Sequence, residues 1–396
     1  MTNLTPPTAT LGYCTNVHAG TDLAAIRSNL DQYAVVVREA CGLEELGVGL
    51  WVPAKAAADL ARDTASFSSF LRDRHLRPFT INGFPYDNFH QPIVKHRVYQ
   101  PTWADQERFE YTCQLADLLA ELLSAQGDEF VGSISTLPLG WPTELSSPGR
   151  LDRAGENLRR LTDHLAELES KSGRRIVVAI EPEPGCQIDT TDDVIEWFAK
   201  QLPDEKHRRY LTVCHDNCHS AVMMESQSDV LKRLARAGIA IGKVQVSNAI
   251  VADWQSMAAG RRREAVGQLR EFAEDRYLHQ TGRLLASGEF ELAEDLPDLL
   301  GDPALGDLPM GEDRRWTVHF HVPIFLERFG HLSTSQNEVL DCLQHLNSSE
   351  CAADFTGHFE IETYAWTVLP ARMRRRGLAE DIAGEVDWLR RALAWS

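Results

Sequence analysis

Short, almost continuous apolar runs alternate along the chain with longer segments in which apolar residues recur at positions i, i+3 and i+4. The apolar runs predict β-strands, and the periodic segments predict amphipathic α-helices. Nine runs have the strand pattern: residues 10–18, 46–53, 77–86, 129–141, 176–181, 210–216, 240–247, 316–325 and 358–366. The clearest helical patterns cover residues 104–125, 151–172 and 377–394. The chain is therefore expected to belong to the α/β class.

Regular alternation of strands and helices predicts a parallel sheet. Eight strands with polar, chemically active residues at their C-terminal ends favour a single (β/α)8 TIM barrel. We assign the ninth run, 316–325, to an excursion between strands seven and eight, an insertion of about residues 250–345. An open doubly wound sheet is the alternative, and the absence of a G-x-G-x-x-G after the first strand and of any P-loop weakens it. Without repeats or linkers, residues 1–396 are expected to form one domain.

Two segments are candidates for a cover over the mouth of such a barrel. Residues 87–103 form a long polar and aromatic loop, and loops of this length are often lids or binding loops. Residues 283–312 are acidic and have little regular pattern, after a stretch at 254–280 that is expected to be helical. The sequence leaves open which of the two covers the site.

The net charge of −18 argues against nucleic acid and against an anionic membrane surface as partners. No apolar run approaches the roughly 20 residues that span a bilayer, and the first residues lack the basic and apolar regions of a secretory signal. The eight cysteines are scattered, and several, such as Cys14 and Cys113, lie among apolar residues. We therefore expect free thiols, a cytoplasmic location and a small-molecule partner, whereas the oligomeric state is not indicated.

Carboxylates follow the fifth and sixth expected strands. Glu181 and Glu183 come after I-V-V-A-I, and Pro182 and Pro184 keep that segment extended, so both carboxylates point to one side. Such groups need a cation, either a bound metal or a nearby Arg or Lys. Asp216 and His219 end the sixth strand, where a carboxylate and an imidazole suit a divalent metal. The alternative is that Asp216 caps the next helix and His219 bonds to backbone.

The last strand carries Glu360 and Glu362 on one face. Glu362 lies nearer the C-terminal end and is the better ligand, whereas Glu360 would lie deeper and be held by hydrogen bonds. Gln245 interrupts the apolar seventh strand, where its amide oxygen can serve as a neutral ligand or be satisfied within the core. Each of these strands thus adds a polar group to the same end of the barrel.

Further polar residues are candidates for substrate binding. His319 and His321 share one face of the run 316–325, where they can bind a metal, hydrogen-bond a polyol or be structural. His18, Asn82 and Trp141 lie at the ends of the first, third and fourth strands, where they suit a pocket that binds hydroxyls and stacks on a sugar ring.

The order of Glu181, Asp216-x-x-His219 and Glu362 on strands five, six and eight resembles the metal-ligand pattern of the xylose-isomerase-like TIM barrels. The resemblance covers nearly the whole chain, and this superfamily includes sugar phosphate isomerases/epimerases and AP endonuclease type 2 enzymes. More narrowly, the segments L-G-Y-C-T-N-V-H-A-G, T-I-N-G-F-P-Y, I-E-P-E-P-G and H-F-H-V-P-I-F resemble the EboE family of metabolite traffic proteins.

One position departs from this pattern. Sugar epimerases of the superfamily place a histidine on strand seven, where this chain has Gln245. A neutral oxygen donor favours Mn or Mg over Zn, although Zn stays possible. His319 or His321 is the alternative source of the imidazole.

The resemblance implies a divalent-metal-dependent sugar isomerase or epimerase that acts on a polyhydroxylated or secondary metabolite through a metal-bound enediolate. It implies metal ligands Glu181, Asp216, Gln245 and Glu362, with Glu181 and Glu362 as the proton-transfer groups and with His219 and Glu183 orienting hydroxyls. The alternatives are a non-catalytic, transport-associated barrel that binds a metabolite and a metal-dependent hydrolase of the endonuclease branch, which the acidic charge disfavours.

Overall fold

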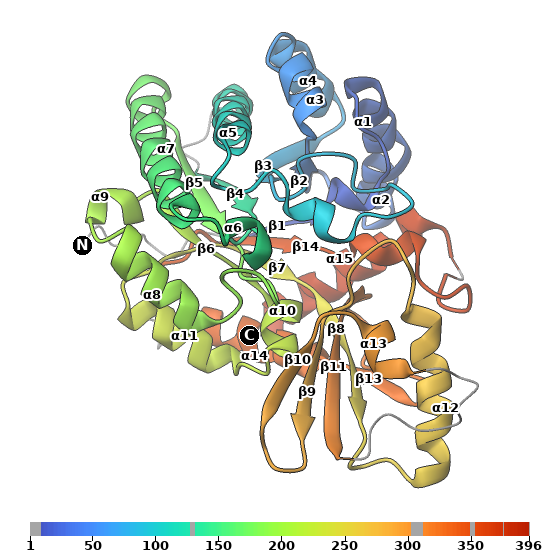
Figure 1. Cartoon of the computed structure of the whole chain (residues 1–396). Coiled ribbons are helices and arrows are strands. Elements are labelled where there is room, and N and C mark those ends of the chain that lie inside the picture. Colours follow the sequence, from blue (N-terminus) through green and yellow to red (C-terminus); the bar gives the residue numbers. More distant parts are fainter. Residues whose placement is uncertain (1–8, 127–130, 302–311, 349–352, 375, 396) are drawn as a thin grey trace.

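A closed barrel of eight parallel strands forms the centre of the protein. The computed structural model describes residues 9–126, 131–301, 312–348, 353–374 and 376–395 (Figure 1). The strands follow the spatial order β1-β14-β7-β6-β5-β4-β3-β2. Their bounds are β1 Thr10–Cys14, β2 Leu46–Trp51, β3 Leu76–Asn82, β4 Val131–Thr136, β5 Arg175–Ile180, β6 Leu211–Asp216, β7 Ile241–Val246 and β14 His358–Ile361. The predicted (β/α)8 barrel is confirmed.

The barrel strands are buried on both faces because one face lines the interior of the barrel and the other packs on helices. Every residue of β6 and β7 is buried, as are the last five residues of β5. Parallel pairing keeps neighbouring strands in step, so that Asp216 of β6 lies beside Gln245 of β7, and Gln245 beside Glu360 of β14. The polar residues at the C-terminal strand ends therefore meet at one mouth of the barrel.

Helices surround the barrel (Figure 1). The main ones are α1 Leu23–Asn29, α2 Val35–Ala40, α3 Ala54–Leu60, α4 Thr64–Asp73, α5 Gln106–Gln126, α7 Arg150–Ser172, α8 Thr191–Gln201, α11 Gln227–Arg236, α14 Gln336–Asn347 and α15 Leu378–Trp395. Shorter helices are α6 Pro142–Leu145 and α10 Asn217–Val222, which follow the C-terminal ends of β4 and β6, and α9 Glu205–Arg208, which precedes β6. Local sequence signals set several ends: Thr190 and Asp193 form a capping box at the start of α8, and Gly173, with φ 70°, ends α7.

A second, antiparallel sheet is inserted after β7. Only Ser247 separates β7 from β8, so the chain passes directly from the barrel into this sheet, whose order is β10-β9-β11-β8-β13-β12. Its elements are β8 Asn248–Asp253, α12 Ala259–Leu269, β9 Thr281–Leu285, β10 Phe290–Ala293, α13 Leu296–Leu300, β11 Asp313–Val322, β12 Arg328–Phe329 and β13 Leu332–Thr334. Figure 1 shows the sheet beside the barrel, where β11 and β8 pack on α10.

The excursion between strands seven and eight was predicted, but its internal structure was not. The helix expected over 254–280 is limited to α12, and the region 283–312 contains β10, α13 and part of β9, with 302–311 outside the described residues. Residues of β9 and β10 are mostly half-exposed, so neither a buried run nor clear alternation marks them. The helix α14 then returns to the outer layer, packed between α11 and α15.

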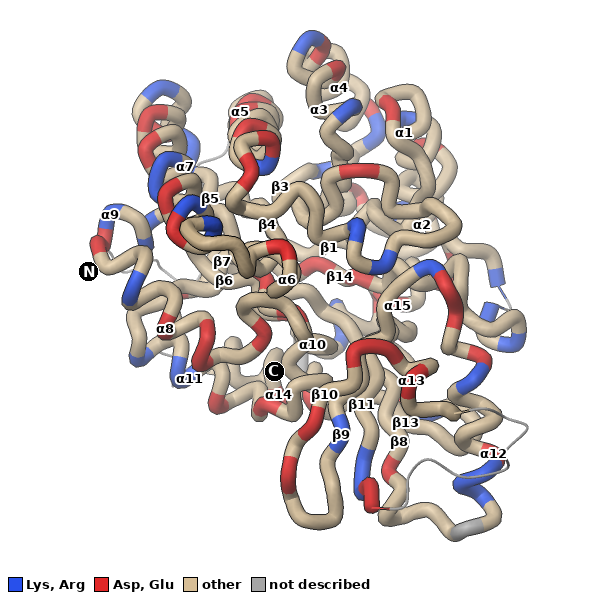
Figure 2. The backbone as a smooth tube through the Cα atoms, in the orientation of Figure 1, with Lys and Arg blue, Asp and Glu red and all other residues tan. Residues whose placement is uncertain are grey.

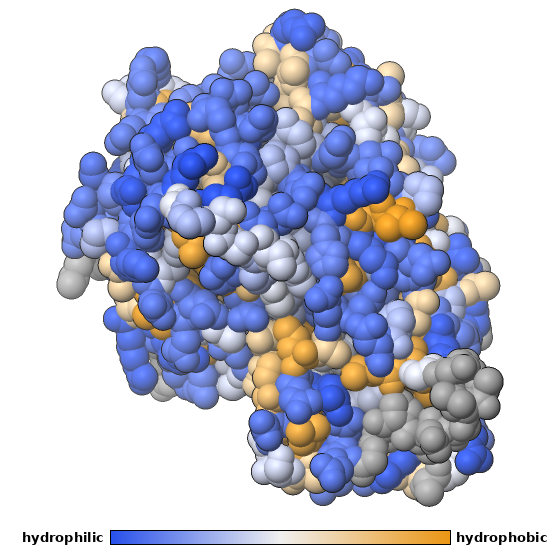
Figure 3. All heavy atoms as spheres, viewed as in Figure 1, coloured by the Kyte–Doolittle hydropathy of each residue, from blue (hydrophilic) through white to orange (hydrophobic). Residues whose placement is uncertain are grey.

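The surface is polar and of mixed charge. Figure 2 shows acidic and basic residues interspersed along outer helices such as α7, and Figure 3 shows a mainly hydrophilic face with small separate hydrophobic patches. No helix among the described residues combines the length and apolar character required to cross a bilayer. The seven described cysteines are free thiols, as expected.

Candidate active site at the barrel mouth

A pocket of about 520 Å³, counted to its opening into solvent, lies at the C-terminal mouth of the barrel. Residues from β3, β5 and β14, from the loop after β3 and from the inserted sheet line it. Its polar side consists of a group of buried acids and imidazoles, which together with Asp216 we call the mouth cluster: Glu181, Glu183, Asp216, His219, His319, His321 and Glu362.

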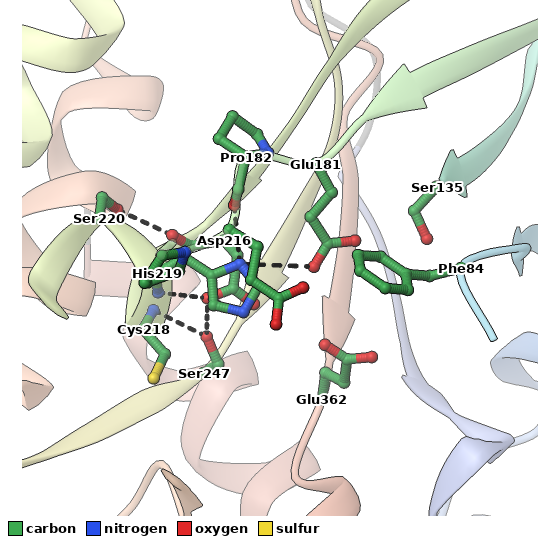
Figure 4. A network of polar contacts seen from close by, with 12 residues as sticks. Phe84, Ser135, Glu181, Pro182, Asp216, Cys218, His219, Ser220, Ser247 and Glu362 are labelled. Carbon is green, nitrogen blue, oxygen red and sulfur yellow. Dashed lines mark hydrogen bonds and ion pairs between the residues drawn. The ribbon is translucent and has the colours of Figure 1, made fainter. Parts of the chain in front are cut away.

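Three carboxylates of the mouth cluster converge on one point. Glu181, Asp216 and Glu362 each offer an oxygen, and these three oxygens lie within 4.8 Å of one another. Figure 4 shows the carboxyl groups of Glu181 and Glu362, from different strands, turned toward the same space beside Asp216 and His219. Groups so placed can share the coordination sphere of one divalent ion.

In two of these carboxylates the protein holds one oxygen in place. Glu362 Oε1 accepts hydrogen bonds from the side-chain amides of Asn16, at 2.8 Å, and Asn82, at 2.7 Å. Asp216 Oδ1 accepts from the backbone N–H of His219 and from the Ser247 hydroxyl, both at 2.8 Å. Supporting hydrogen bonds of this kind orient metal-ligating carboxylates.

Two buried oxygens of the three converging carboxylates, Asp216 Oδ2 and Glu181 Oε2, have no hydrogen-bond partner among the described residues. Burial raises the pKa of both Glu181 and Glu362 well above the usual value, and the charge of Asp216 raises them further. Within the described part of the chain, no lysine or arginine forms an ion pair with these three carboxylates. The charge of Lys243 lowers both pKa values only in part, because this lysine is paired with Glu360, so the site suits a bound cation.

The three imidazoles of the mouth cluster share one tautomer. The Nδ1 atoms of His219, His319 and His321 each face a carbonyl oxygen, which can only accept a hydrogen bond. Those oxygens belong to Pro182 at 2.8 Å, to the Gln280 side chain at 2.7 Å and to the Glu362 backbone at 2.6 Å, in that order. The hydrogen-bond network therefore assigns the proton to Nδ1 and leaves the lone pair on Nε2 in all three rings.

These Nε2 lone pairs point at one another and at Asp216. The Nε2 atoms of His219 and His319 are 3.2 Å apart, and His321 Nε2 is 3.9 Å from Asp216 Oδ2. Burial lowers the pKa of His321 to about 4 and that of His319 well below its usual value, which disfavours a proton between the rings. Ligand atoms about 2.1 Å from a common ion lie roughly 3–4 Å apart, so the spacing fits a shared metal.

Glu183 belongs to the same cluster but is held differently. Its Oε1 accepts a hydrogen bond of 2.6 Å from the Tyr99 hydroxyl, and the Gln280 amide lies 3.4 Å away. The Gln280 Nε2 group also donates to the Pro184 carbonyl at 3.1 Å, which fixes the amide orientation that His319 requires. Tyr99 and Gln280 come from the loop after β3 and from the inserted sheet, so both parts of the chain support the site.

The structure shows the helix cap and the backbone bond that were the alternative for Asp216 and His219. Asp216 caps α10 with Oδ1 and leaves Oδ2 without a hydrogen-bond partner among the described residues, and His219 bonds to the Pro182 backbone with Nδ1 and lines the pocket. Their role as metal ligands stays a prediction. Gln245 is fully buried, and neither of its side-chain polar atoms has a partner among the described residues. The amide is thus not a satisfied core glutamine, and its role as a ligand stays a prediction.

The remaining predicted residues occupy different places. Asn82 lines the pocket and holds Glu362. His18 is buried beneath the mouth and does not line the pocket; its Nε2 lies 3.1 Å from the Tyr13 hydroxyl, and burial lowers its pKa to about 3. Trp141 stacks behind Tyr99, with ring centroids 5.2 Å apart, and is also outside the lining. Substrate contacts by His18 and Trp141 stay predictions.

Several residues of the site were missed. Asn16 lies two residues after β1 in the segment T-N-V-H, a signal comparable to the one that singled out His18. Tyr99 lies in the loop 87–103, and Gln280 directly precedes β9, where no local pattern marks it. Of the two candidate covers, the loop after β3 lines the pocket with Phe89, Val94 and neighbouring side chains.

A second buried charge group lies deeper in the barrel. Lys243 Nζ and Glu360 Oε2 are 2.5 Å apart, and both side chains have no exposed surface. The Lys243 ammonium also donates to the Ser135 hydroxyl at 3.2 Å. Glu360 fits because Gly49 has no side chain: a Cβ there would lie 1.3 Å from Glu360 Oε1. We call Lys243 and Glu360 the interior pair; the deep position expected for Glu360 is thus observed.

Comparison with known proteins supports the fold. A xylose isomerase-like TIM barrel protein from Mycobacterium smegmatis, solved in complex with magnesium, is 13% identical over 99% of both chains, with a TM-score of 0.51. A D-tagatose 3-epimerase-like protein is 12% identical over 68% of this chain and 88% of its own, with a TM-score of 0.40. The D-allulose 3-epimerase from Methylomonas sp., in complex with D-allulose, is 10% identical over 68% and 83%, with a TM-score of 0.38.

The likeness to the Mycobacterium smegmatis protein shows that the chain has the fold of the xylose-isomerase-like TIM barrels. No protein-family model and no curated protein matches the chain. The narrower resemblance to the EboE family is not confirmed.

Proposed function

We propose that the protein is a divalent-metal-dependent isomerase or epimerase of a polyhydroxylated metabolite. The observation that supports this most is the convergence of Glu181, Asp216 and Glu362. Around the barrel, the strands that carry Asp216 and Gln245 lie between the strands that lead to the two glutamates. The narrower form of this proposal is that the protein handles a secondary metabolite, as the resemblance to EboE proteins implies.

The donor set fits a divalent ion. Buried carboxylate oxygens without partners, on Glu181 and Asp216, and the unpartnered Nε2 of His321 are the groups that a cation would satisfy. Glu181, Asp216 and Glu362 would hold it, with His321 as the imidazole and Gln245 as a further oxygen donor. A ligand set of carboxylates and an imidazole suits Mn or Mg, and it also suits Zn, which is the softer ion. When bound, such an ion polarises a substrate carbonyl and acidifies the adjacent C–H group.

The residues of the chain would then move the proton. Glu181 and Glu362 come from β5 and β14 and would reach the substrate from two sides, so that one removes a proton from the carbon next to the carbonyl and the other returns one. Asn16 and Asn82 hold Glu362 in orientation by their amides. Glu183, fixed by Tyr99, and His219 would bind substrate hydroxyls.

Exchange of solvent deuterium into the substrate tests the proposal. Across a panel of ketoses and aldoses, we expect the wild-type protein to introduce deuterium at the carbon next to the carbonyl. Glu181→Gln and Glu362→Gln should lose this exchange while remaining folded. Saturable binding without exchange by the wild-type protein would instead indicate a non-catalytic metabolite-binding barrel.

Metal-dependent hydrolysis is the second candidate, and the facing imidazoles of His219 and His319 favour it. Glu183, His219 and His319 offer a second set of ligand atoms within 4.8 Å of one another, and hydrolases often use two metals. Two equivalents of tightly bound metal, together with loss of one equivalent in His319→Ala, would favour hydrolysis. One equivalent, unchanged in His319→Ala, would favour the isomerase.

A further inference from the structure

Part of the pocket lining, which includes Tyr364 against His321 of the mouth cluster, is apolar and aromatic. Phe89, Tyr277 and Tyr364 come from three separate parts of the chain, and their rings are in mutual contact, with centroids 4.9–5.2 Å apart. The Tyr277 hydroxyl donates to the Phe89 backbone carbonyl at 3.1 Å. Because the hydroxyl is engaged in this bond, the ring is the part of Tyr277 that can contact a ligand. The rest of this part of the lining is made by Phe84, Pro85, Val94, Val98 and Leu278. We call these eight residues the aromatic wall.

The pocket offers no free positive charge for an anionic substrate group. Among the described residues that line it, Lys95 is the only lysine or arginine, and its ammonium is 2.6 Å from Asp295 Oδ2. Three acids line the same pocket, namely Glu181, Glu183 and Glu362. A phosphate group bound away from the proposed metal ion would therefore find no free lysine or arginine among these side chains.

The usual phosphate-binding place of this fold is also occupied by other structure. In TIM barrels, a phosphate commonly binds at the loops after strands seven and eight and at the N-terminus of a short extra helix. Here β7 continues after Ser247 into β8, so the inserted sheet takes the place of a loop after strand seven. After β14, the chain enters a 3-10 turn at Tyr364–Thr367, and its first residue belongs to the aromatic wall.

We propose that the substrate is an uncharged, phosphate-free polyol or hydroxyketone that carries a planar apolar group. The hydroxylated end would lie at the mouth cluster, and the planar group would stack on the aromatic wall, where aromatic contact adds to the burial of apolar surface. This substrate class rests on the proposed function, because the reacting end is placed at the same acids.

Calorimetric titration of the full-length protein with three matched ligands tests the substrate class. The ligands are a ketohexose, its 6-phosphate and its 6-O-benzyl ether, which share the carbonyl and the neighbouring hydroxyls. We expect the benzyl ether to bind at least tenfold more tightly than the parent sugar, and the 6-phosphate to bind more weakly than the parent. Tighter binding of the 6-phosphate, or equal binding of the benzyl ether and the parent, would overturn the inference.

Variants test whether the preference for the benzyl ether arises at the aromatic wall. Phe89→Ala should remove most of the preference for the benzyl ether and change the affinity for the parent sugar less than threefold, and Phe89→Leu should retain part of the preference if the alanine variant is unstable. Phe109→Ala is the matched control, because Phe109 lies on α5 against Arg160, away from the pocket. A preference that survives in both Phe89 variants would also overturn the inference.

The same titration separates the two proposals. If the parent sugar binds and exchanges deuterium but the benzyl ether shows no advantage, the substrate class is wrong and the isomerase proposal stands. If none of the three ligands binds, both are wrong.

Discussion

The barrel buries charge at two levels, and the two levels satisfy it in different ways. In the interior pair, Lys243 and Glu360 neutralise each other at 2.5 Å. In the mouth cluster, the carboxylates of Glu181, Asp216 and Glu362 converge with no lysine or arginine paired to them in the described chain. Carboxylate oxygens without a hydrogen-bond partner among the described residues occur at both levels, on Glu181, Asp216 and Glu360. Burial is almost complete at both levels. The difference therefore lies in charge balance, which suits a structural role for the interior pair and the cation-binding role proposed for the mouth cluster.

Breaking the interior pair should have the largest effect on stability. Lys243→Met leaves Glu360 buried without its cation, and we expect the free energy of unfolding in urea to fall by about 3–5 kcal/mol. The double variant Lys243→Met, Glu360→Met replaces the pair with apolar side chains of similar volume and should recover most of that loss. A single variant as stable as the wild type would contradict the structural role of the pair.

Glu385 on α15 is an intermediate case, since it is hydrogen-bonded but not charge-balanced. It accepts from the Ile324 backbone N–H, the Thr363 hydroxyl and the Trp366 indole, yet burial raises its pKa from 4.5 to about 7. The folded state thus binds the proton more tightly than the unfolded state. The stability contributed by Glu385 is fully present below pH 4.5 and is lost as the pH rises to about 7, by roughly 3 kcal/mol.

Urea unfolding at a series of pH values checks this sign. Glu385→Gln should flatten the fall in stability between pH 4.5 and 7, whatever its effect on stability at a single pH. An unchanged pH slope in Glu385→Gln would show that other groups cause it.

Metal addition should stabilise the mouth cluster without acting on the interior pair. After treatment with a chelator, Mn2+ at 100 times its dissociation constant should raise the free energy of unfolding by about 2.7 kcal/mol. Glu181→Gln should lose most of this gain, because its Oε2 is one of the unpartnered oxygens. The double variant Lys243→Met, Glu360→Met should retain the gain, and equal losses in the two proteins would remove the distinction between the levels.

The smallest expected effect is a gain in the free energy of unfolding, opposite in sign to the loss expected for Lys243→Met. In chelator-treated protein, Glu181→Gln removes one of three converging carboxylates, and we expect the free energy of unfolding to rise by about 1–2 kcal/mol. Glu196→Gln, an exposed substitution of the same kind on α8, should stay within about 0.5 kcal/mol of the wild type. Destabilisation by Glu181→Gln in metal-free protein would show that the mouth cluster is already balanced.

The parts of the site that lie on barrel strands could be predicted from the sequence. Glu181, Asp216 and Glu362 follow apolar runs directly, and the ends of parallel strands meet at one mouth, so their convergence follows from the fold alone. The interior pair left a weaker signal. Lys243 is two residues before Gln245 and shares its face, but its partner on β14 is identified only by strand register, through contacts far apart in the chain.

The supporting residues could not be predicted in the same way. Tyr99 and Gln280 act through contacts between the loop after β3, the segment before β9 and the segment after β5, and no local pattern encodes such contacts. Part of the inserted sheet could not be predicted for a related reason. Most residues of β9 and β10 are half-exposed, so hydrophobic periodicity is weak in these strands. Its central strand β11 is buried over its last seven residues, which explains why the run 316–325 was recognised.

The link at Ser247 has a consequence for engineering this protein. The Ser247 hydroxyl accepts from the Cys218 backbone N–H and donates to Asp216, so the hinge between barrel and sheet is also a support of the presumed ligand. A minimal barrel made by excising residues 248–334 would lose His319, His321 and Gln280 in the same cut. The inserted sheet is thus not a detachable accessory, and shortened or chimaeric versions of the chain must keep it whole to keep the site.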